Sequence, residues 1–181
     1  MRKFTLDTNC IIDLDENRPN AVFVQKIVAA WRTGQVELAV VAVTASENQQ
    51  SKKANRDFGE FENKLVRVGL KGVYHLLPMM KWDVFYWDHA LWSEEQMEVL
   101  YAQIQEILFP DISLVPPEDI ELNSSWRNKA CDVLVAWSHA HHKWDILVTS
   151  DTNFHKKRDK LQTVGVNEIL YPKEAASLCT P

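Results

Sequence analysis

Two almost continuously apolar stretches constrain the fold of this chain more than any other feature. Residues 36–43 read VELAVVAV and residues 145–149 read DILVT. Such runs, without the alternation of a half-exposed strand, are typical of strands buried on both faces. Segments with apolar residues at helical spacing lie between the strands, the clearest being 124–140. This alternation predicts a three-layer α/β/α fold with a mainly parallel sheet covered by helices on both sides.

Shorter patterns complete the expected order of elements. Apolar stretches predict three further strands, at 4–6, 73–77 and 166–170. Helices are expected at 8–15, between Pro19 and Gly34, directly after the strand at 36–43, and at about 58–68, 93–109, 124–140, 155–163 and from 172 onward. With 181 residues and no linker-like segment, we expect one domain over 1–181. Its central region, at about 51–124, is enlarged and mostly helical.

Composition excludes several classes of protein. No apolar run approaches the roughly 20 residues that cross a bilayer, and no signal peptide is evident, so we expect a cytoplasmic protein without membrane contact. Cys10, Cys131 and Cys179 are too widely separated for a disulfide framework or a zinc site, and we expect them to be buried or half-buried. A net charge of -5 fits poorly with a surface that binds nucleic acid everywhere, but it allows an acidic cation site with basic residues nearby.

Carboxylates follow the predicted strands at the positions where α/β proteins place their functional crevice. Asp7 follows the strand at 4–6, and Asp151 follows the strand at 145–149. Glu47 lies just past the strand at 36–43, at the start of the next helix. Carboxyl ends of parallel strands meet at one edge of the sheet. Asp132 is a fourth candidate, because it lies beside the apolar stripe of its helix and can border that crevice.

Converging carboxylates repel one another unless cations or protons compensate their charge. Mg²⁺ and Mn²⁺ are the divalent cations that prefer such oxygen ligands, and a phosphodiester is a substrate that they activate toward hydrolysis. Each residue alone has a simpler explanation. Asp7 and Asp151 could cap helices, Glu47 could be a solvated first-turn residue, and Asp132 could lie on the surface. Their joint placement along an alternating α/β chain favours a site.

The motifs around these carboxylates resemble those of PIN-domain nucleases. The opening LDTNCIID and the late LVTSDTNF look like the first and last acidic motifs of that family, and Glu47 and Asp132 match in order and spacing. The stretch 166–172 (VNEILYP) is similar to the family's final edge strand. The resemblance covers roughly residues 1–50 and 125–175. It implies a Rossmann-like parallel sheet and a Mg²⁺- or Mn²⁺-dependent endoribonuclease; many bacterial members of similar size are toxins of toxin–antitoxin pairs.

The resemblance also implies roles for individual residues. The metal ligands would be Asp7, Glu47, Asp132 and Asp151. Thr149 would orient Asp151 or a metal-bound water, and Asn9 would support Asp7. Asn153 departs from the acidic residue more common at its position, which lowers the charge of the site. The chain is also longer than the compact toxins, mainly in residues 51–124.

Basic and aromatic residues suggest where partners bind. Lys156, Lys157 and Arg158 follow the last acidic motif, where they could contact RNA phosphates or simply form a solvated helix face. The tryptophans at 82, 87 and 92 suggest core packing or a partner surface, for a homodimer or an inhibitor such as an antitoxin, rather than base stacking.

Two alternatives to a ribonuclease remain open on sequence alone. One is a PIN-like module that binds RNA or protein without cleaving, and Asn153 is the residue that favours it. The other is a phosphatase of the haloacid-dehalogenase type, which also begins with an Asp after its first strand. That family needs a second Asp two residues later, where this chain has Asn9.

Overall fold

A parallel sheet organises the protein. The computed structural model describes residues 1–42, 58–80, 90–111 and 124–179. In this part of the chain the sheet has five strands in the order β3-β2-β1-β4-β5, and every pairing is parallel. The strands are β1 (Arg2–Leu6), β2 (Val36–Val41), β3 (Tyr74–Leu76), β4 (Ile146–Val148) and β5 (Glu168–Leu170). All five lie where the apolar stretches predict them, and the expected parallel sheet is confirmed.

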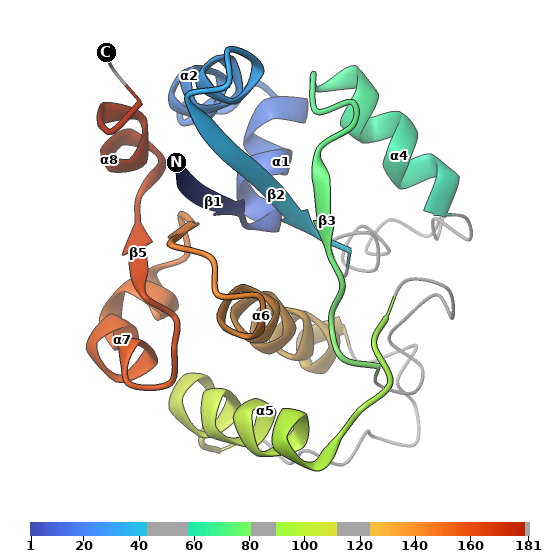
Figure 1. The fold of residues 1–181 in the computed structure, drawn as a ribbon, viewed down its shortest axis with the longest axis vertical. Helices are drawn as coiled ribbons and strands as arrows, with labels where there is room; N and C mark the ends of the chain where they lie inside the picture. Colours follow the sequence, from blue (N-terminus) through green and yellow to red (C-terminus); the bar gives the residue numbers. More distant parts are fainter. Residues whose placement is uncertain (43–57, 81–89, 112–123, 180–181) are drawn as a thin grey trace.

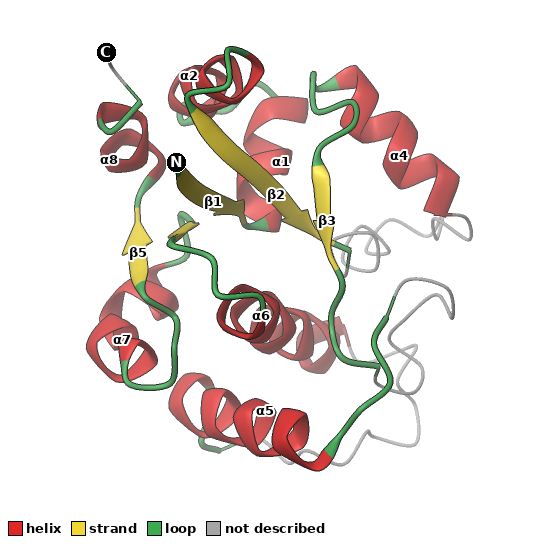
Figure 2. Ribbon diagram, viewed as in Figure 1, coloured by secondary structure: helices red, strands yellow, loops and turns green. Residues whose placement is uncertain are grey.

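Helices cover both faces of the sheet, as Figures 1 and 2 show. One layer contains α1 (Thr8–Asp15), α2 (Ala21–Arg32), α4 (Phe58–Arg67) and α8 (Pro172–Ser177). The opposite layer contains α5 (Glu95–Leu108), α6 (Ser124–His141) and α7 (Thr152–Gln162). The predicted three-layer α/β/α fold is therefore confirmed.

The two-sided burial of β2 explains its apolar sequence, which only Glu37 interrupts. Leu38 and Val40 pack in the core beneath α1, α2 and α4, whereas Ala39 and Val41 pack in the core beneath α5 and α6. Successive side chains of a strand point to opposite faces, so a strand between two helical layers needs apolar residues at every position. The same rule applies to Ile146, Leu147 and Val148 in β4, all of which are buried.

Helix α6 is the long helix that the spacing of its apolar residues predicts. Its stripe of Ala130, Val133, Trp137 and Ala140 is buried, and Trp137 Nε1 donates to the Met97 carbonyl of α5 at 3.0 Å. Helix α7, in contrast, begins at Thr152 and not at 155 as expected, because the Asp151 side chain caps it by accepting a hydrogen bond from the Asn153 backbone N–H at 2.7 Å.

The remaining expectations concern the helix after β2, the tryptophans, the cysteines and membrane contact. The helix after β2 and the tryptophans at 82 and 87 lie outside the described residues. Trp92 is 74% exposed, which rules out the core and leaves a surface role for it. Cys10 and Cys131 are buried and Cys179 is half-buried, all as free thiols, as expected. Within the described ranges, no helix is both long and apolar enough to cross a bilayer.

Candidate functional site

The site lies where the strand order reverses direction. From β1 the chain builds the sheet toward β2 and β3, and then returns to the other side of β1 to add β4 and β5. In open α/β sheets the crevice at such a switch point, at the carboxyl ends of the strands, is where ligands bind. Asp7 directly follows β1, and its backbone N–H donates to the Val148 carbonyl at 3.0 Å. Asp151 follows β4, so the two carboxylates are brought to one edge of the sheet.

Asp7 is buried and surrounded by hydrogen-bond donors. The residue is only 2% exposed. Oδ1 accepts the backbone N–H of Thr8 at 2.7 Å, and Oδ2 accepts the Thr149 hydroxyl at 2.6 Å and the Asn9 side-chain amide at 3.2 Å. The expectation that Asn9 supports Asp7 therefore matches a direct contact. The carboxylate is held in one orientation by three donors.

Thr149 connects Asp7 to Asp151. While its hydroxyl donates to Asp7, the same oxygen accepts the backbone N–H of Asp151 at 3.0 Å. Thr149 is completely buried, whereas Asp151 is half-buried. Thr149 thus orients the backbone of Asp151 and the side chain of Asp7 at once. This is close to the role that the sequence motif implies for it.

The electrostatics of Asp7 show that burial outweighs its hydrogen bonds. Desolvation is the largest influence and raises the pKa of Asp7 from 3.8 to about 6. The donors Thr149, Thr8 and Asn9 lower the pKa, while the negative charge of Asp151 raises it further. The repulsion shows that the two carboxylates lie close enough to influence each other. A cation between them would relieve it.

Both aspartates also cap helices, so a purely structural role has to be weighed. Asp7 caps α1 and Asp151 caps α7. A cap stabilises a helix by about 1 kcal/mol and needs only to reach the first turn. Burying Asp7 instead raises its pKa by about two units, which disfavours its ionised form by roughly 3 kcal/mol. A cap needs only the Thr8 N–H, whereas the Asp7 carboxylate also accepts from Thr149 and Asn9, so capping alone does not account for its setting.

Asn153 and Lys157 connect α7 to the end of α5. The Asn153 side-chain amide donates to the Leu108 carbonyl at 3.2 Å, and the Lys157 ammonium donates to the same oxygen. Lys157 also lies over the Phe109 ring, 5.8 Å from its centroid. Both side chains are therefore engaged in packing helix on helix, whereas Lys156 and Arg158 are exposed on α7.

The other two predicted carboxylates are Glu47 and Asp132. Glu47 lies outside the described residues. Asp132 is half-buried on α6. Within residues 1–42, 58–80, 90–111 and 124–179, no three Asp, Glu, His or Cys side chains are grouped as a metal site. The described site therefore consists of the pair Asp7 and Asp151 with their donors.

The sequence did not predict a role for three polar residues beside this pair. Asp13 on α1 is only 5% exposed and hydrogen-bonds the side chains of Asn20 and Ser150. The Asn20 amide also donates to the Ser150 hydroxyl at 3.1 Å, which ties the loop before Asp151 to α1 and α2. Desolvation raises the pKa of Asp13, and its Oδ2 is buried without a hydrogen-bond partner among the described residues. Its place four positions after Asn9, and so on the same face of a short helix, is the signal that could have revealed it.

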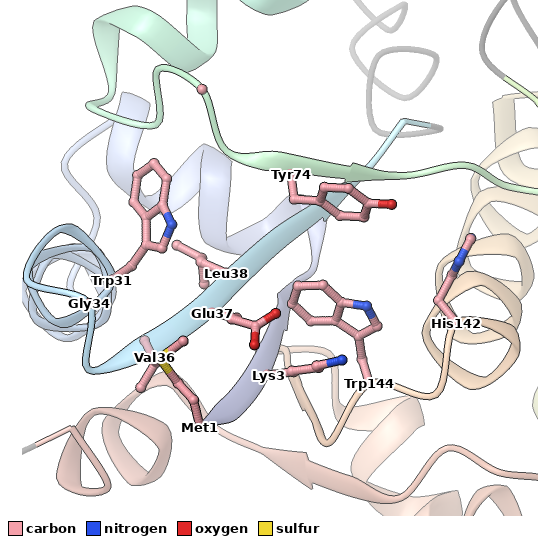
Figure 3. Close-up of a pocket in the computed structure, with 11 residues that line it drawn as sticks. Met1, Lys3, Trp31, Gly34, Val36, Glu37, Leu38, Tyr74, His142 and Trp144 are labelled. Atoms are coloured by element: carbon pink, nitrogen blue, oxygen red, sulfur yellow. The ribbon is translucent and has the colours of Figure 1, made fainter.

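A pocket lies at the opposite edge of the sheet from the carboxylates. This pocket of about 540 Å³ is lined by residues at the amino ends of β1, β2 and β3, including Lys3, Glu37 and Tyr74 (Figure 3). Tyr74 is 60% exposed and stacks on Trp144, with ring centroids 6.1 Å apart. The carboxylates lie at the other, carboxyl ends of these parallel strands. The length of the strands therefore separates them from this pocket.

Comparison with known proteins adds no relative to this picture. The chain matches no protein-family model, and no curated protein matches it. What bears on function is therefore the geometry of the site and the motifs that the chain itself carries.

Proposed function

We propose that this protein is a metal-dependent endoribonuclease whose site includes Asp7 and Asp151. The observation that carries the proposal is the buried carboxylate of Asp7, which is joined to Asp151 through the Thr149 hydroxyl at the switch point of a parallel sheet. The motifs LDTNCIID and LVTSDTNF, which resemble those of PIN-domain nucleases, contain both aspartates.

The residues present fit a Mg²⁺ or Mn²⁺ ion. Both cations prefer carboxylate oxygens, and Asp7 and Asp151 follow neighbouring parallel strands at the same edge of the sheet. Asp7 and Asp151 would hold the ion, and Glu47 and Asp132 are the further ligands that the resemblance implies. When bound, the ion supplies charge neutralisation for the phosphodiester and lowers the pKa of a bound water.

The chain's own side chains prepare the site for this chemistry. Thr149 and Asn9 hold the Asp7 carboxylate in place before substrate arrives, which reduces the reorganisation needed during reaction. Ser150, tied to Asp13 and Asn20, fixes the loop that presents Asp151. Lys156 and Arg158, exposed on the helix that Asp151 caps, would attract the phosphate backbone of RNA.

The test is cleavage of end-labelled single-stranded RNA with Mn²⁺ or Mg²⁺, with and without a chelator. We expect Asp151→Asn to reduce cleavage at least a hundredfold, because it removes a metal ligand while an amide oxygen still caps α7. The matched control is Asp159→Asn on the same helix, whose side chain is 96% exposed, and we expect full activity. Cleavage that survives both the chelator and Asp151→Asn would refute the proposal.

A second function has one observation in its favour. Asn153 stands where the family more often has a carboxylate, and its amide is bound to the Leu108 carbonyl. A site with fewer charges could bind RNA without cleaving it. Tight RNA retention without cleavage under any metal condition would support this binding module. The toxin version of the ribonuclease predicts instead that expression arrests growth and that Asp151→Asn relieves the arrest.

A further inference from the structure

An exposed aromatic pair stands beside the carboxylates at the same edge of the sheet. Tyr171 directly follows β5, and the imidazole of His155 on α7 stacks against its ring, with centroids 3.5 Å apart and planes 10° apart. The backbone N–H of Thr149 donates to the Leu170 carbonyl at 3.1 Å, so Tyr171 lies one strand away from Thr149 and Asp151. The pair is therefore adjacent to the proposed site.

The position of this pair is fixed by hydrogen bonds on both sides. His155 Nε2 lies 2.9 Å from the Thr149 carbonyl oxygen, and because a carbonyl only accepts, Nε2 is the donor. The Tyr171 backbone N–H donates to the Glu174 carboxylate at 2.9 Å, and its carbonyl accepts the Ala175 N–H at 3.0 Å. The ring is thus preorganised, which lowers the entropy lost when a ligand binds against it.

Structural needs do not explain the choice of tyrosine at 171. It occupies the N-cap of α8, where its backbone N–H binds the Glu174 carboxylate, and tyrosine is not among the residues preferred there. The residue is 39% exposed although the His155 ring stacks against one face of its ring. A solvent-accessible aromatic residue whose ring is already supported on one side suits a planar ligand.

We propose that Tyr171, supported by His155, is a stacking platform for a base of single-stranded RNA bound next to the site. This inference rests on the proposed ribonuclease function and names a contact that selects an unpaired nucleotide. Stacking on an aromatic ring is tolerant of base identity and is a recurrent way of binding single strands. The exposed cations Lys156, Arg158 and Lys160 lie on the helix that carries His155, where they complement the phosphates of the same strand.

The test measures RNA binding without cleavage, by fluorescence anisotropy of a labelled single-stranded RNA with chelator present. We expect Tyr171→Ala to weaken binding roughly 5- to 150-fold, the range of one lost base stack, and Tyr171→Phe to leave it unchanged. The control is Tyr74→Ala, which removes another exposed, stacked tyrosine at the opposite edge of the sheet and should have no effect. An abasic strand of equal charge should bind the wild type and Tyr171→Ala equally.

Several results would overturn the platform. They are unchanged binding in Tyr171→Ala, an equal loss in Tyr74→Ala, an equal loss on the abasic strand, or no RNA binding by the wild type. None of these binding results depends on metal or on cleavage. Failure of the stacking platform is therefore distinguishable from failure of the proposed ribonuclease function, which the cleavage assay tests separately. Circular dichroism and urea unfolding of each variant establish that a loss of binding is not a loss of folding.

Discussion

Replacing Asp7 with asparagine should stabilise the protein at neutral pH while abolishing its activity. The side chain is fully buried, and its pKa is raised from 3.8 to about 6. Each pKa unit corresponds to 1.36 kcal/mol, so ionised Asp7 lowers the free energy of unfolding by about 3 kcal/mol relative to a neutral isostere. Asparagine must place its NH₂ group toward a donor, since all three contacts of Asp7 are donors. Reorienting the Thr149 hydroxyl and the Asn9 amide offsets about 1 kcal/mol, leaving a net gain of about 2 kcal/mol.

The pH dependence gives this prediction a second, sharper signature. A carboxyl whose pKa is raised by folding binds more protons in the native state than in the unfolded state between pH 3.8 and about 6. The native state is therefore favoured below this window, and stability falls as the pH rises through it. We expect the difference in unfolding free energy between Asp7→Asn and wild type to increase from pH 4 to about 6.5 and then remain constant.

Urea unfolding of both proteins at several pH values, in chelator, measures this difference directly. Subtracting the two curves removes the titration of every other group. Asp159→Asn is the control, because its exposed carboxylate should give a difference near zero at all pH values. A difference that is independent of pH, or a variant less stable than wild type at pH 7.5, would refute the reasoning about Asp7.

Three other substitutions test separate parts of the structure. Asn153→Ala removes the bond to the Leu108 carbonyl and should lower the unfolding free energy by about 1 kcal/mol without loss of cleavage, because the backbone N–H still binds Asp151; Asp159→Asn on the same helix is the neutral control. Asp13→Leu releases Ser150 and should reduce kcat about tenfold at unchanged KM, and a normal kcat would show that the loop needs no such support. Trp137→Phe loses the bond from Nε1 to the Met97 carbonyl and part of a buried ring, and should cost about 2 kcal/mol in thermal unfolding; a cost below 0.5 kcal/mol would contradict its central place between α5 and α6.

The fold was predictable because it depends on burial, which leaves a periodic signal in sequence. Strand β2 has apolar residues on both faces, and α6 has its stripe from Ala130 to Ala140, so their types and places follow from spacing alone. The start of α7 was missed by three residues because the stretch after Asp151 is polar and shows no apolar period. The capping bond that begins the helix is a single contact, which leaves little trace in composition.

The site was predictable only in part, for a related reason. Asp7 and Asp151 were found because the ends of neighbouring parallel strands must meet at one edge. The links through Asp13 and Ser150, and the stacking of His155 on Tyr171, join residues far apart in the chain. No spacing rule connects such residues before the fold is known. For Lys157 the sequence suggested a contact that the structure does not favour. Its place in a basic run suggested an RNA-phosphate contact, but its ammonium donates to the Leu108 carbonyl at the end of α5.

The location of a bound metal tests the central claim most directly. Crystals of the protein with Mn²⁺ allow the ion to be placed by its anomalous scattering, independently of any activity. The account predicts a peak about 2.1 to 2.3 Å from carboxylate oxygens of both Asp7 and Asp151, and its loss in crystals of Asp151→Asn. A Mn²⁺ peak bound elsewhere, with none at these two aspartates, would contradict it.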